Sequence, residues 1–144
     1  MEVKHNDSTI NRPWGERPID APMVPIDLHA YTQQLMLEES WQKNDRNAIT
    51  VFKTDQLTIV LMALHAGTET TPATVEGTGV MTLQMLDGDI AFSAGSDTVE
   101  LSRGQMVVLH EHIPFRIKAK QESVCLLTMT RENNNNKDIP SPLH

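Results

Sequence analysis

The sequence predicts an all-β protein whose strands form a sandwich or a barrel. From residue 48 onward, eight short apolar segments follow one another, and several alternate apolar with polar residues. Turn-forming sequences separate these segments, such as DG at 87–88 and AGSD at 94–97. Many short strands with hairpin turns between them are typical of closed or double-layered β folds. The length of 144 residues fits one such domain.

The segment before the predicted strands has a different character. Residues 1–26 contain four of the eight prolines, and proline fixes φ and removes a backbone donor, so we expect an extended, partly disordered arm. Residues 27–47 are predicted to hold one helix and a linker. Asp27 can cap the helix, and Leu28, Tyr31 and Leu35 recur with helical spacing.

Residues 48–130 are predicted to form the barrel. The expected strands, in order, are 48–53, 57–64, 79–86, 89–94, 97–101, 105–110, 115–119 and 123–129. Residues 131–144 are polar and rich in asparagine, which predicts a disordered tail.

Composition limits the compartment and the partners. The formal net charge is −7, which argues against a nucleic-acid partner because neutralising phosphates needs clustered Lys and Arg. The first residues lack the apolar core of a secretory signal. No apolar run approaches the roughly 18 residues of a membrane span. We therefore expect a cytoplasmic protein with neither a nucleic-acid nor a membrane partner.

The order of the strands between residues 48 and 130 resembles a single-domain cupin of the RmlC-like jelly-roll type, a double-stranded β-helix. The clearest parts are LDGDIAF, VELSRGQMVVL and IPFRIKA. In metal-bearing cupins, three histidines and one glutamate from two motifs converge on one ion inside the barrel. Anchoring the motifs on Gly88 and Gly104 places Met81 at the glutamate position and Phe115 at a histidine position. Thr74 or Val75 occupies the first histidine position of the first motif, and Glu76 or Gly77 occupies the second, where one carboxylate alone would not make a site. The resemblance therefore implies a member without the usual metal ligands, and we expect no metal and no cofactor.

Strand parity extends the resemblance to the barrel interior. If positions 81 and 115 face inward, their alternate neighbours face inward as well. The predicted interior is apolar, so it suits packing or an apolar ligand and disfavours a bare metal ion. The residues predicted to line it are Thr74, Val75, Met81, Leu83, Met85, Phe115 and Ile117. Gln84, His110 and His112 are candidates for a polar rim.

Two functions follow from these observations. The first is a non-catalytic, metal-free cupin domain, with no catalytic residue, that binds a small, mainly apolar molecule or serves as a homodimeric interaction or regulatory domain. The alternative is a metal-dependent oxygenase or isomerase that uses the displaced histidines His65, His110 and His112. The HEH sequence at 110–112 would place two imidazoles on one face of a strand, which is a spacing that metal sites use.

Overall fold

The computed structural model describes residues 4–6, 17–71, 73, 79–110 and 112–131. Its elements follow the chain in the order β1 (Lys4–Asn6), β2 (Arg17–Asp20), α1 (Leu28–Leu37), α2 (Glu39–Lys43), β3 (Arg46–Lys53), β4 (Leu57–Leu64), β5 (Val80–Asp87), β6 (Asp89–Ala94), β7 (Asp97–Ser102), β8 (Met106–His110), β9 (Phe115–Ala119) and β10 (Ser123–Thr130). All eight strands predicted after residue 48 are present, each within two residues of its expected ends. Neither described helix is long and apolar enough to cross a membrane.

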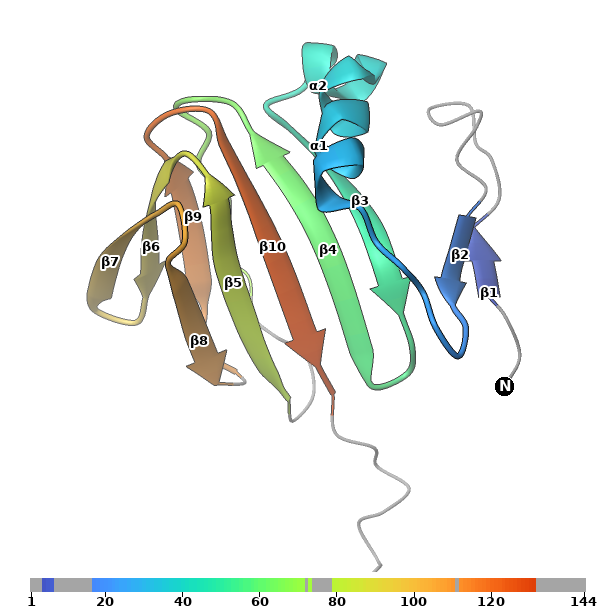
Figure 1. The fold of residues 1–144 in the computed structure, drawn as a ribbon. Helices are drawn as coiled ribbons and strands as arrows, with labels where there is room; N and C mark the ends of the chain where they lie inside the picture. The colour runs from blue at the N-terminus through green and yellow to red at the C-terminus, as the bar shows by residue number, and fades with distance from the viewer. Residues whose placement is uncertain (1–3, 7–16, 72, 74–78, 111, 132–144) are drawn as a thin grey trace, which may run out of the picture.

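The strands form the two layers of a jelly roll, which confirms the predicted fold class. The larger sheet has the order β3-β4-β10-β5-β8, and the smaller one has the order β7-β6-β9. Every pairing within them is antiparallel. Figure 1 shows the three-stranded sheet behind β5 and β8, with both helices beside β3 and β4. The strands β1 and β2 form a separate two-stranded sheet within the predicted arm.

Two hydrophobic clusters hold these layers together. The inner core lies between the two sheets and consists of Leu64, Met81, Leu83, Met85, Ile90, Phe92, Leu101, Leu109, Ile117, Ala119, Cys125 and Leu127. The outer core lies between the helices and the opposite face of the larger sheet, and consists of Leu35, Trp41, Ile49, Val51, Leu61, Ala63 and Val124. Both faces of the larger sheet therefore bury apolar side chains, because adjacent residues of a strand point to opposite faces.

The prediction of one continuous helix was wrong, because Glu38 separates α1 from α2. Its backbone is extended, with φ −75° and ψ 148°. Its buried carboxylate accepts hydrogen bonds from Asn47 Nδ2 at 3.0 Å and from Gln34 Nε2 at 3.2 Å. Asn47 also donates to the Leu35 carbonyl at 2.9 Å, so a side chain from β3 satisfies the end of α1. The predicted cap is present, since Asp27 Oδ1 accepts from the amide of Ala30 at 3.0 Å.

The polar segment after β4 also pairs with the smaller sheet. The amides of Gly67, Thr70 and Ala73 donate to carbonyls of β9 at 2.8, 2.9 and 2.9 Å. This segment lies between two of the predicted strands and is rich in threonine. Its hydrogen bonds cover the edge of β9 that β6 leaves open.

Candidate functional site

The structure places most of the predicted interior residues in the inner core. Met81 and Leu83 have no exposed surface, and Met85 and Ile117 are almost fully buried. All four pack in one cluster with residues of both sheets. Thr74 and Val75 lie outside the described residues. The part of the interior that the structure describes is therefore packed with side chains.

Phe115 is the predicted interior residue that is only partly buried. Its ring stacks on Phe92, with centroids 5.5 Å apart and an interplanar angle of 14°. Phe115 also lines a hollow of about 430 Å³ at the ends of β6 and β9, together with Ser93, Gly95, Pro114 and Arg116. One ring thus contacts the inner core and borders a surface hollow.

The candidates for a polar rim do not converge on the interior. Gln84 is exposed and alternates along β5 with the buried Leu83 and Met85, so it lies on the outer face of the sheet. His110 is the last residue of β8 and is exposed. His112 is exposed and has φ 64°, a left-handed conformation. The two imidazoles therefore do not share one face of a strand, because the strand ends before His112.

His65 joins the end of β4 to α2. Its ring stacks on the indole of Trp41, with centroids 3.4 Å apart and an interplanar angle of 17°. Its Nε2 lies 2.7 Å from the Trp41 carbonyl oxygen. Its backbone amide donates to the Asp45 carbonyl at 3.0 Å. These contacts explain the position of His65 through packing and hydrogen bonding.

The strand register separates His65 from His110. Leu64 pairs with Ser123 at one end of β10, next to the pairing of Val124 with Asp87. His110 pairs with Val80 at the other end of β5. Seven residue steps of about 3.3 Å place these ends roughly 23 Å apart. Within the described part of the chain, no three His, Cys, Asp or Glu side chains are placed to hold a metal ion.

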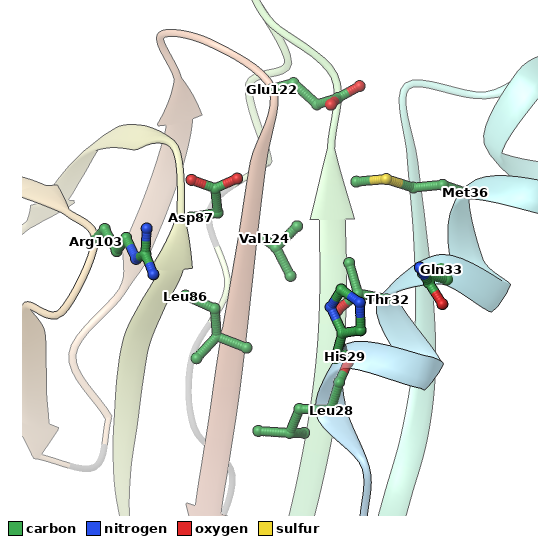
Figure 2. Close-up of a pocket in the computed structure, with 10 residues that line it drawn as sticks. All are labelled: Leu28, His29, Thr32, Gln33, Met36, Leu86, Asp87, Arg103, Glu122 and Val124. Carbon is green, nitrogen blue, oxygen red and sulfur yellow. Dashed lines mark hydrogen bonds between the residues drawn. The ribbon is translucent and has the colours of Figure 1, made fainter.

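A groove lies between α1 and the outer face of the larger sheet. We call it the helix–sheet groove, and its volume is about 560 Å³. Figure 2 shows α1 on one side, Arg103 on the other, and Leu86 and Val124 between them. The lining residues are Leu28, His29, Thr32, Gln33 and Met36 from α1, and Leu86, Asp87, Arg103, Glu122 and Val124 from the sheet and its turns.

The fold explains why the groove opens at this position. Leu35 and Trp41 anchor the two helices over β3 and β4 in the outer core. The sheet continues past the helices through β10 and then β5, as Figure 1 shows. Leu86 and Val124 face this side because they alternate with the inner-core residues Met85 and Cys125. The floor of the groove is therefore apolar.

The rim of the groove carries exposed polar and charged groups. Arg103 is brought beside β5 by its turn, in which the amide of Gly104 donates to the Met85 carbonyl at 2.9 Å. Asp87 Oδ1 accepts from the amide of Gly88 at 3.0 Å. Among the described residues, neither Arg103 nor Glu122 makes a side-chain hydrogen bond or ion pair. Both side chains are exposed at the rim of the groove.

Comparison with solved structures identifies the architecture. A conserved protein of unknown function from Streptococcus pyogenes aligns with a TM-score of 0.62 and 22% identity, covering 80% of this chain and 92% of that one. A cupin superfamily protein from Desulfitobacterium hafniense aligns with a TM-score of 0.58 and 15% identity, covering 62% and 80%. An RmlC-like cupin protein from Desulfovibrio desulfuricans aligns with a TM-score of 0.55 and 21% identity, covering 59% and 81%. The chain has the cupin fold. At these identities the likeness concerns the fold alone.

No protein-family model and no curated protein sequence matches the chain. The cupin fold thus rests on the arrangement of strands rather than on shared motifs. This agrees with the sequence, in which Met81 and Phe115 stand at two of the positions where metal-bearing cupins place ligands. The helix–sheet groove was not predicted from the sequence, because its lining residues come from a helix, two strands and two turns that are distant in the chain.

Proposed function

We propose that this cupin-fold chain is a non-catalytic binding protein that holds a small, mainly apolar molecule in the helix–sheet groove. The observation that carries the proposal is the groove itself, whose volume of about 560 Å³ lies within the roughly 300–1,000 Å³ usual for small-molecule sites. Its floor is apolar and its rim is polar, which is the common pattern of such sites. The described interior residues Met81, Leu83, Met85 and Ile117 are instead buried in the inner core.

A neutral apolar probe tests this proposal. Phenylpropanol is titrated into the protein while the backbone amide chemical shifts are followed by NMR. The largest changes are expected at Leu86, Val124 and α1. The variant Leu86→Gln places a polar amide on the floor and should weaken binding several-fold, because burying an unpaired amide is unfavourable. Met106→Gln is the matched control, since Met106 is an exposed apolar residue on the same sheet face outside the groove.

The outcomes are distinct. Shift changes that cluster on the groove and weaken only in Leu86→Gln support the proposal. Changes confined to inner-core residues such as Leu83 would place the ligand in the barrel. Melting temperatures of both variants establish that they are folded before the titrations are compared.

A second candidate function is homodimeric association through β8, favoured by exposed apolar side chains on that strand. Met106 and Val108 are 53% and 58% exposed. In the described residues, β8 lies at the edge of the larger sheet and pairs with β5 alone. Exposed apolar edge strands are sites of association. A second copy is the occupant that we propose, because the same strand can pair with itself in antiparallel fashion.

Sedimentation equilibrium at micromolar concentrations tests this second function. A dimer in the wild type that becomes a monomer in Val108→Lys supports association through β8. A wild-type monomer at tens of micromolar would remove it. Val99→Lys is the control, because Val99 is also an exposed valine on a strand, at 44%, but lies in the smaller sheet.

A further inference from the structure

We infer that the helix–sheet groove selects an apolar molecule that carries an ammonium group over the same molecule with a carboxylate. This inference rests on the groove being the ligand site, as proposed above. It specifies which charge on the ligand is preferred, because the apolar floor does not determine that charge. The charged groups around the rim carry the argument.

The charges that line the groove sum to a negative value or to zero. Asp87 and Glu122 contribute two negative charges, and Arg103 contributes one positive charge. With His29 counted as neutral the sum is −1, and with His29 counted as charged the sum is 0. The whole chain, with these groups included, has a formal charge of −7. Because two carboxylates face one guanidinium around the rim, the groove favours a cationic ligand over an anionic one.

The placement of the two carboxylates favours an ammonium group at one end of the groove. Val124 pairs with Asp87, and Glu122 lies two residues before Val124 in the turn that precedes β10. Figure 2 shows both carboxylates at the same end of the groove, beyond Leu86 and Val124. A ligand whose apolar body lies on this floor would direct an ammonium group toward that end. Ammonium donors are suited to carboxylate acceptors.

Arg103 does not reverse this preference. Its guanidinium stands at the β5 side of the groove, and it has no ion pair with either carboxylate among the described residues. The two acids therefore keep their charge available for a ligand. A carboxylate ligand near Arg103 would still meet the field of Asp87 and Glu122.

A matched set of three probes tests the inference. Phenylpropylamine, phenylpropanol and phenylbutyrate share one apolar body and differ in carrying an ammonium, a hydroxyl or a carboxylate. Their dissociation constants are measured by amide NMR titration at low ionic strength. We expect the amine to bind about tenfold more tightly than the carboxylate, with the alcohol between them. This follows because each exposed carboxylate favours a cation and opposes an anion by a few-fold.

Charge-neutral variants identify the groups responsible. In the double variant Asp87→Asn/Glu122→Gln, the preference for the amine should fall to about twofold or less, while the alcohol binds as before. Asparagine at position 87 keeps an oxygen that can accept from the amide of Gly88. The control Asp55→Asn/Asp97→Asn removes the same charge at exposed positions outside the groove and should keep the preference.

Each outcome has one meaning. If the alcohol binds but the amine binds no more tightly than the carboxylate, the charge inference fails and the proposed function stands. If the double variant keeps the wild-type preference, Asp87 and Glu122 are not its source and the inference also fails. If none of the probes changes the shifts of groove residues, the proposed function itself fails.

Discussion

Truncation of Leu83 tests whether the barrel interior is packed. Leu83 has no exposed surface and lies on the central part of β5, paired with Leu127 of β10 and Val107 of β8. Strands on both sides limit how far the structure can collapse around a smaller side chain. Leu→Ala substitutions at such sites cost about 3–5 kcal/mol. We therefore expect Leu83→Ala to lower the free energy of unfolding by about 3.5 kcal/mol, a large share of the roughly 5–15 kcal/mol of an ordinary domain.

The assay is urea unfolding followed by circular dichroism, with the slope of the transition compared between variants. Gln84→Ala is the matched control, since Gln84 is the next residue of β5 and is exposed on the other face. It should change the free energy of unfolding by no more than about 0.5 kcal/mol. A cost below about 1 kcal/mol for Leu83→Ala, with an unchanged slope, would refute the reasoning. Such a small cost would indicate open space in the interior, and the barrel would then be the better candidate for the ligand site.

Three further predictions concern two glycine turns, the cap of α1 and the inner core. Gly88→Ala should lower the free energy of unfolding by about 3 kcal/mol or more, because Gly88 has φ +91° and a Cβ there would lie 2.3 Å from Ser123 Oγ. Gly104→Ala should cost only about 1–2 kcal/mol, because Gly104 has φ +86° but nothing lies within 4 Å of its Cβ position. Equal urea midpoints for the two variants would contradict the predicted clash at Gly88. Asp27→Ala should cost about 1 kcal/mol through loss of the α1 cap, measured by the same unfolding, and no loss would mean that water replaces the cap. Burial raises the pKa of the Cys125 thiol to about 12. A thiol reagent at pH 8 should therefore label Cys125 only after urea unfolding. Rapid labelling of the folded protein would show that this part of the inner core opens.

The barrel could be predicted from the sequence because its signals are local. The apolar run LTIVLMAL, the alternation along VMTLQML and the turn at Gly88 each depend on a few neighbouring residues. The same parity rule placed Met81, Leu83 and Met85 inward, and all three are buried. Local patterns therefore predicted the strands, while the resemblance to cupins together with strand parity predicted the inward faces of β5 and β9.

The remaining features depend on contacts between distant residues. The break at Glu38 requires an amide from Asn47 on β3, which no helical periodicity reveals. The prediction that His110 and His112 share one face required the strand to continue to His112. The backbone of His112 is left-handed instead, so the alternation of side chains along β8 does not reach it. The groove forms because α1 packs over β3 and β4, while the sheet continues past α1 through β10 and β5. Sequence patterns predict elements, but they do not predict which elements leave a gap between them.

The separation of the two hydrophobic cores bears on how this protein can change over evolutionary time. The inner and outer cores share no residue, and they lie on opposite faces of the larger sheet. Substitutions at exposed groove positions such as His29, Gln33 and Arg103 touch neither cluster. Such substitutions cost little stability when they avoid buried side chains. Substitutions there can therefore change the shape and charge of the groove while the barrel keeps its packing, so α1 and the turns that face it are the parts of this fold that can change at the least cost in stability.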